Sequence, residues 1–271
     1  MLDPVVAVDR LRAAFAGPAQ HRTLHAKGRF YGGTFTATPE ATALCRAGHL
    51  SGAPTPVVVR WSNAGGNAAV PDPKPDIRGM AVKFKLADGT STDLLGQTSP
   101  LFLLTHPKML PAIAAGVRGK AIGSPVSFAE VTFYPIHAYG WLTADGARTW
   151  VRYVFRAVAT EADRLPTAYD GPDRLAAEMT ARLARGPVTH EVWVQVAGAG
   201  HDPHSAVSVW KDCRELLAGR IVVTEELADP ETGGTPTVFD PTRVVDGIEL
   251  SDDPILRYRA SAYTESVNRR V

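Results

Sequence analysis

The hydrophobic positions of this chain recur with two different periods, which divide it into predicted strands and predicted helices. Alternating or β-branched apolar runs, such as GMAVKFKL at residues 79–86, are typical of half-buried strands. By this criterion we expect strands over residues 28–38, 56–62, 79–86, 100–105, 133–142, 149–155, 188–197 and 219–224. Asp145-Gly146 lies between two of these strands and predicts a hairpin turn.

Apolar positions at helical spacing occur at both ends of the chain and in two internal segments. Asp3, which a proline follows, predicts the start of the first helix. Asp252 or Asp253, just before another proline, predicts the start of the last helix. The internal helices are expected over residues 107–115 and 172–185.

The order of these elements indicates the fold class. Many strands with hairpin turns and few helices favour an α+β fold built on an antiparallel barrel or sandwich with helices attached. The Pro- and Gly-rich segments 65–75 and 198–204 are predicted to be loops. No linker, repeat or low-complexity segment interrupts the pattern, so we expect a single domain over residues 1–271.

Composition narrows the function classes. The chain has 271 residues, 45% of them hydrophobic, and a net charge of +1 without any block of Lys and Arg. It can therefore bury a substantial core, and neither nucleic acid nor a membrane is expected as a partner. The first helix carries acidic residues and no long apolar run, so we expect no signal peptide. Cys45 and Cys213 form no CxxC pair and favour a reducing compartment, so we expect a cytoplasmic protein.

The last predicted helix carries a pair of residues whose spacing suits metal chemistry. Arg259 and Tyr263 are four residues apart and share a helix face, to which Arg270 returns seven residues later. A guanidinium one turn from a phenol can donate a hydrogen bond to its oxygen and favour the phenolate. Haem iron can be held by such a tyrosine. The same spacing also occurs in ordinary amphipathic helices, so the pair alone leaves both interpretations open.

A second motif lies near the start of the chain, in Arg-Thr-Leu-His-Ala-Lys-Gly at residues 22–28. His25 at its centre belongs to the commonest acid–base residue type of enzymes, although a lone histidine is more often structural. The segment resembles the distal-histidine motif of haem catalases. Further segments resemble motifs of the same family in the same order: RWSN at 60–63, DIRGMAVKF at 76–84, DLLGQTSP at 93–100, FDPTR at 239–243 and the terminal Arg-x-x-x-Tyr.

This ordered set covers nearly the whole chain, and the chain is most similar to the short catalase-related peroxidases within the family. The resemblance implies an eight-stranded antiparallel β-barrel with attached helices that binds haem b, an iron cofactor. It also implies a peroxide and a small organic reductant as reaction partners. A homodimer is a candidate assembly.

The resemblance implies a role for five residues in holding the haem. Tyr263 would be the iron ligand and Arg259 its charge partner. By motif position, Arg22, Arg60 and Arg270 would bind the two propionates, because buried carboxylates need charged hydrogen-bond donors.

The resemblance also implies the catalytic residues. His25 would move a proton between the two oxygens of a peroxide, and Ser62 would orient the His25 ring. Gln97 stands where larger catalases have an asparagine that holds peroxide, so the amide is kept but shifted by one methylene. Leu110 stands where a phenylalanine often covers the haem. These departures predict peroxidase activity with weak or no catalase activity.

Three other functions stay open from the sequence. The same site could isomerise a hydroperoxide or perform a specialised biosynthetic oxidation. A non-enzymatic haem carrier would need Tyr263 and Arg259 but not His25. A plain ligand-binding β-barrel would bind no haem.

Overall fold

The computed structural model describes residues 3–18, 20–102, 121–233 and 236–270. The strands in these ranges are β1 (Gly28–Ala37), β2 (Thr55–Asn63), β3 (Arg78–Lys85), β4 (Ser91–Gln97), β5 (Ala138–Leu142), β6 (Arg148–Ala157), β7 (Val188–Val196), β8 (Arg214–Leu227) and β9 (Ile248–Leu250). The α-helices are α1 (Pro4–Phe15), α2 (Pro39–Leu44), α4 (Arg174–Leu183) and α5 (Pro254–Asn268). Short 3₁₀ helices are η1 (Gly48–Leu50), η3 (Phe128–Glu130), η4 (Glu161–Asp163) and η5 (Pro230–Gly233).

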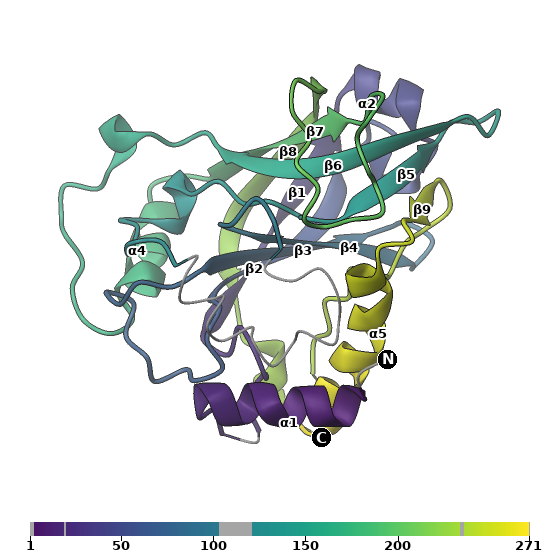
Figure 1. Ribbon diagram of the computed structural model, residues 1–271. Helices are drawn as coiled ribbons and strands as arrows, with labels where there is room; N and C mark the ends of the chain where they lie inside the picture. The colour runs from purple at the N-terminus through teal and green to yellow at the C-terminus, as the bar shows by residue number, and fades with distance from the viewer. Residues whose placement is uncertain (1–2, 19, 103–120, 234–235, 271) are drawn as a thin grey trace.

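The strands form one curled antiparallel sheet in the order β4-β3-β2-β1-β8-β7-β6-β5-β9 (Figure 1). This confirms the predicted α+β fold and curled antiparallel sheet, which has nine strands in the described residues where eight were expected. Isolated bridges join Gln97 to Tyr134 and Phe133 to Phe155. Through these two bridges the segment at 133–134 links β4 to β6, which lie far apart in the strand order.

Side chains alternate across the sheet because successive residues of a strand face opposite sides. The inner face carries a core of large buried side chains from most strands, including Tyr31, Phe35, Trp61, Phe84, Phe133 and Trp141. A second, smaller apolar cluster joins α1 and α5 to the segments that flank β2 and β3; it contains Ala7, Leu11, Ala64, Ile77, Ile255 and Tyr258. Two terminal helices thus pack together against one side of the sheet.

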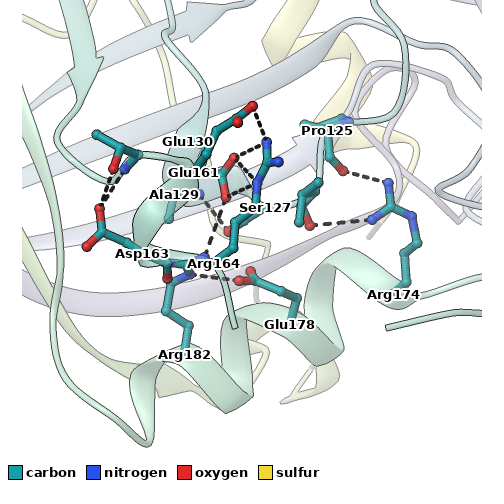
Figure 2. Close-up of polar contacts among 12 residues, drawn as sticks. Pro125, Ser127, Ala129, Glu130, Glu161, Asp163, Arg164, Arg174, Glu178 and Arg182 are labelled. Atoms are coloured by element: carbon teal, nitrogen blue, oxygen red, sulfur yellow. Dashed lines mark hydrogen bonds and ion pairs between the residues drawn. The ribbon is translucent and has the colours of Figure 1, made fainter. Parts of the chain in front are cut away.

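A polar network attaches α4 to the barrel (Figure 2). Arg182 of α4 donates from Nε to Glu178 at 2.7 Å and from Nη1 to the Asp163 carbonyl at 3.2 Å. Both side chains of the Arg182–Glu178 pair are almost fully buried. Beside them, Arg164 donates to Glu130 at 3.0 Å. The network ties α4 to η3 and η4 by charge as well as by apolar contact.

The structure corrects several predicted elements. Residues 100–102 form no strand, because Pro100 has no N–H with which to extend the β4 ladder. Of the segment 133–142, only Ala138–Leu142 is a strand. The predicted helix at 107–115 and the rest of 100–105 lie outside the described residues. The sequence patterns missed α2, β4 and β9, of which β4 is rich in polar residues and β9 has three residues.

Other predictions hold with small shifts in their ends. Asp3 caps α1 and Asp253 caps α5, each accepting a hydrogen bond from the backbone N–H two residues later at 2.8 Å. Cys45 and Cys213 are free thiols. Among the helices of the described ranges, none combines the length and apolar character needed to cross a membrane.

Candidate functional site

One cavity brings together residues from both ends of the chain. Its lining residues come from the sheet and from the terminal helices α1 and α5, and it has a volume of about 1500 Å³ including its opening to solvent. Figure 1 shows α1 and α5 beside each other next to the sheet. It is lined by every residue that the sequence assigned to a site: Arg22, His25, Arg60, Ser62, Gln97, Arg259, Tyr263 and Arg270. The lining that the structure describes contains these arginines and no Asp or Glu, so the cavity suits an anionic ligand.

The backbone holds His25 in a left-handed conformation with φ of 56°. Such a conformation is uncommon for a residue with a Cβ and is retained only where neighbours enforce it. The His25 N–H donates to the Ala64 carbonyl at 2.9 Å, and the His25 carbonyl accepts from Arg60 Nη1 at 2.9 Å. These bonds clamp the residue on both sides and fix the direction of its side chain.

The His25 ring lies on a small platform made by β2 and β3. Nδ1 lies 2.9 Å from Ser62 Oγ, and Ser62 is paired across the strands with Gly79. A Cβ at Gly79 would lie 2.6 Å from Cε1 and 2.7 Å from Nδ1 of His25, so the ring fits only against glycine. Gly79 was not among the predicted site residues. Its signal in the sequence is a glycine at the beginning of a strand, where close approach of another group is common.

The surroundings of His25 keep its imidazole neutral. Burial lowers the pKa of His25 to about 3, and the nearby guanidinium groups of Arg60, Arg259 and Arg22 act in the same direction. A neutral imidazole can accept a proton, so His25 is suited to act as a base from mildly acidic pH upward.

On the other side of the cavity, four polar side chains form a hydrogen-bonded row. Arg259 donates from Nη2 to Tyr263 Oη at 2.5 Å, and its Nη1 lies 3.0 Å from Nε2 of His137. Nδ1 of His137 lies 2.8 Å from Asp253 Oδ2. Because an arginine can only donate, Nε2 of His137 accepts and Nδ1 carries the hydrogen that Asp253 accepts. The row fixes the Arg259 guanidinium against the Tyr263 phenol.

The ionisation of this row follows from burial. Burial lowers the pKa of His137 to about 4, against the opposing hydrogen bond to Asp253. Burial alone would raise the pKa of Asp253, but the hydrogen bond from His137 and two backbone N–H groups outweigh it, and the net shift is downward. His137 is therefore neutral and Asp253 ionised. The sequence predicted Asp253 only as a helix cap, and it gave no role to His137, a single histidine within an apolar strand pattern.

Besides Arg259, the arginines Arg22, Arg60 and Arg270 bring positive charge to the cavity. Arg22 and Arg270 both donate to Oε1 of Glu231, Arg270 at 2.9 Å, so two guanidinium groups share one carboxylate. Burial lowers the pKa of Arg60 to about 9, and the charge of Arg22 acts in the same direction. The Nε atoms of Arg22 and Arg60 are buried and have no hydrogen-bond partner.

Gln97 offers no free amide N–H to the cavity within the described residues. Its Nε2 donates to the carbonyls of Ser99 and Leu101, each at 3.3 Å. Its side chain therefore supports its own loop. Leu110, the other predicted departure, lies outside the described residues.

These observations fit a bound haem. A phenol held by a guanidinium is a suitable iron ligand, and the unpartnered Nε atoms of Arg22 and Arg60 are donors for propionate oxygens. Glycine at position 79 leaves the His25 ring the space it needs beside the cavity. The remaining lining is largely apolar, as a porphyrin ring requires.

Comparisons with known proteins show which family the whole chain resembles. The family model described as Catalase matches residues 5–121 and 117–271. A catalase-related peroxidase of Mycolicibacterium paratuberculosis is 38% identical, with 99% of this chain and 95% of the relative covered. A catalase-related peroxidase of Synechococcus elongatus is 24% identical, with 98% of this chain and 88% of the relative covered.

Solved structures share the fold. A fungal catalase superposes with a TM-score of 0.79 at 19% identity, covering 97% of this chain and 62% of the fungal chain. A bacterial catalase gives a TM-score of 0.79 at 21% identity, covering 100% of this chain and 61% of the other. The chain thus spans about three fifths of the length of these solved catalases.

Proposed function

The chain belongs to the catalase family, and from that premise we propose that it is a haem-dependent peroxidase. It reduces organic peroxides and hydrogen peroxide with electrons from a small organic donor, and it has weak or no catalase activity. The observation that carries the proposal is that one cavity is lined by both His25 and a tyrosine hydrogen-bonded to an arginine, Tyr263 with Arg259. A haem carrier would need the tyrosine without the histidine.

The cofactor in this proposal is haem b, with Tyr263 as iron ligand. When bound, haem supplies a ferric iron at which the O–O bond of a peroxide can be broken. Arg259, anchored by His137, donates a hydrogen bond to the Tyr263 oxygen and would hold it in place as the iron ligand. Arg22, Arg60 and Arg270 bind the propionates, for which Arg22 and Arg60 have free Nε donors.

His25 carries the proton in the reaction. Its neutral ring accepts the proton of the incoming peroxide and returns it to the oxygen that leaves as water or alcohol. Ser62 holds the ring at Nδ1, which leaves Nε2 for this transfer. Gly79 acts as a positioning residue because it gives the ring its place.

Low catalase activity follows from the state of Gln97 in this proposal. Oxygen formation requires a second peroxide to be held beside the histidine. The Gln97 amide is bonded to two carbonyls of its own loop, so it is poorly placed to hold that molecule. A misplacement of about 1 Å can lower a rate by about a hundredfold.

The proposal also includes the domain organisation and the location of the protein. We infer that residues 1–271 form one haem-binding domain, since the cavity is lined by residues of α1, the sheet and α5 together. The free thiols Cys45 and Cys213 favour a reducing location such as the cytoplasm.

The test is a spectrum followed by a peroxide and donor panel. The protein purified with haem should show the absorption of a tyrosine-bound, high-spin ferric haem. It should then oxidise organic donors with an alkyl hydroperoxide or hydrogen peroxide faster than it releases oxygen from hydrogen peroxide alone.

The other outcomes separate the alternatives. No haem spectrum after supplementation with haem contradicts the proposal altogether. Haem binding without peroxide cleavage indicates a carrier. A rearranged product from a lipid hydroperoxide in the absence of donor indicates an isomerase, because reduction to the alcohol needs a donor.

A further inference from the structure

Trp61 lies directly behind the wall of the cavity. It stands in β2 between Arg60 and Ser62, which both line the cavity, while the Trp61 side chain points to the opposite face of the sheet. Its indole is fully buried in the barrel core. A single layer of backbone therefore separates the indole from the candidate haem site, a distance on the order of 10 Å or less, the spacing of two packed layers.

The indole is surrounded by other rings. Tyr31 approaches it edge to face, with ring centroids 4.9 Å apart and an angle of 62°. His190 lies at 5.8 Å and Phe128 stacks at 6.3 Å. Burial lowers the pKa of His190 to about 4, so this ring adds no positive charge beside Trp61. Of these rings Phe128 presents its face to the indole, and an aromatic face stabilises a neighbouring cation by its quadrupole.

Among the residues that the structure describes, none accepts a hydrogen bond from the Trp61 N–H. A buried indole usually finds an acceptor, as Trp141 does by donating to the Tyr153 hydroxyl at 2.7 Å. A buried donor without an acceptor destabilises the fold. The missing acceptor also means that the Trp61 ring has no base to take its proton if the ring loses an electron. Tyr31 likewise has an unpartnered hydroxyl, and burial raises its pKa.

We infer that Trp61 is a redox-active residue that donates one electron to the cavity site during peroxide reduction and holds the resulting charge as an indole radical cation. The inference rests on the proposed function. It assigns Trp61 to the electron path of the reaction, while an organic donor acts later.

The proposed step uses one of the two electrons that the reduction of a hydroperoxide requires. A hydroperoxide takes up two electrons and two protons, its O–O bond breaks, and an alcohol and water leave. The site then lacks two electrons, and Trp61 supplies one of them. No proton moves in this step, because Nε1 keeps its hydrogen in the absence of an acceptor. A small organic donor afterwards supplies two electrons, one to the indole and one to the site, so the protein returns to its starting state.

The experiment uses the full-length protein loaded with haem and mixed with an alkyl hydroperoxide without donor. Samples frozen during the reaction are examined by electron paramagnetic resonance. We expect an organic radical signal whose line shape changes when the protein carries ring-deuterated tryptophan. The signal should fall at least tenfold in Trp61→Phe and persist in Trp141→Phe, a matched control because Trp141 is equally buried but hydrogen-bonded. Mass spectrometry after repeated peroxide exposure should find added oxygen on the peptide with Trp61.

An unchanged signal in Trp61→Phe overturns the inference. So does a line shape that responds to deuterated tyrosine and not to deuterated tryptophan, which would assign the radical to a residue such as Tyr31. The labelling in the unmutated protein keeps the test decisive if Trp61→Phe folds poorly. Failure to bind haem or consume peroxide would contradict the proposed function instead, so the two failures are distinguishable.

Discussion

Two tyrosines of α5 differ in whether their hydroxyl group has a hydrogen-bond partner. Tyr258 and Tyr263 both line the cavity. Tyr263 accepts a hydrogen bond from Arg259, whereas the Tyr258 hydroxyl is buried without a partner. Burial raises the pKa of Tyr258, and the charge of Asp3 adds to this effect. A neutral phenol is a poor iron ligand. Of the two tyrosines, Tyr263, which has the Arg259 cation beside it, is therefore the one that we propose as the iron ligand.

His25 is the residue whose removal tests the proton transfer. In His25→Ala we expect haem to remain bound and the rate of peroxide cleavage to fall by about 10²–10⁴, the usual contribution of a general acid–base. Stopped-flow absorption of the haem after mixing with peroxide measures this rate. Ser62→Ala is the matched variant. It keeps the His25 ring but removes the hydroxyl that orients it, so we expect a smaller loss of the cleavage rate. A cleavage rate in His25→Ala equal to that of the unmutated protein would remove His25 from the mechanism.

His137 should control how tightly the Tyr263 oxygen holds its negative charge. In His137→Phe, Arg259 and Asp253 both lose their shared partner, so Arg259 is held less firmly against Tyr263. We expect the iron–tyrosine absorption to disappear on acidification at a pH about one unit higher than in the unmutated protein. His137→Gln should lie between the two, since its amide can replace one of the hydrogen bonds. Equal midpoints in all three proteins would contradict this role.

At the scale of elements, the pairing register of β2 and β3 decides which of their side chains line the cavity. The alternation of β2 sends Arg60 and Ser62 to the cavity and Trp61 to the core, and the pairing with β3 places Gly79 opposite Ser62. The alternating pattern of 79–86 predicted its strand within one residue at each end. Register could not be predicted in this way, because it depends on which strands become neighbours.

The buried ion pair between Arg182 and Glu178 in α4 allows a test of how buried charges affect stability. Arg182→Met leaves the Glu178 carboxylate buried without its partner, and we expect the free energy of unfolding to fall by about 3–5 kcal/mol. The double variant Glu178→Leu with Arg182→Met should recover most of this loss because no charge is left unpaired. Arg164→Met is the control, since its side chain is 38% exposed and its ion pairs are worth about 1 kcal/mol or less. Urea unfolding measures all four proteins; a double variant as unstable as Arg182→Met would argue against the ion pair.

At the scale of the whole molecule, the candidate site depends on contacts between distant parts of the chain. His137 is 116 residues from Asp253 and 122 residues from Arg259 along the sequence. The sequence could predict Arg259 and Tyr263 because their helical spacing is local. It could not predict that His137 joins them, or that Glu231 bridges Arg22 and Arg270, because no local period records such contacts. Resemblance to family motifs supplied His25 and Ser62, which local patterns alone would have left as ordinary residues.

Buried histidines should make the fold sensitive to acid. Burial lowers the pKa of His49, His137 and His190 to about 4 and that of His25 to about 3. The unfolded chain binds these protons below about pH 6.5 while the folded protein does not, so the stabilisation is complete above that pH and is lost as the pH falls towards 4.

The change that tests this is His49→Phe, which keeps an aromatic ring beside Phe84 and Phe35 but removes one titrating group. Between pH 6.5 and 4.5 the unmutated protein should lose about 2–3 kcal/mol more than the variant, as one buried histidine implies. Urea unfolding of the haem-free protein at both pH values measures the difference. Parallel losses in the two proteins would exclude His49 as a source of acid sensitivity.

The position of Tyr263 in α5 also determines when this residue is synthesised relative to the rest of the site. α5 follows every strand of the sheet in the chain, so a ribosome makes the platform for His25 well before it makes the proposed iron ligand. At roughly 5–20 residues per second, the interval between β1 and α5 is on the order of ten to forty seconds. During that time the growing chain presents an arginine-lined hollow without its tyrosine. Cofactor loading is therefore expected to be among the last events in the maturation of this protein.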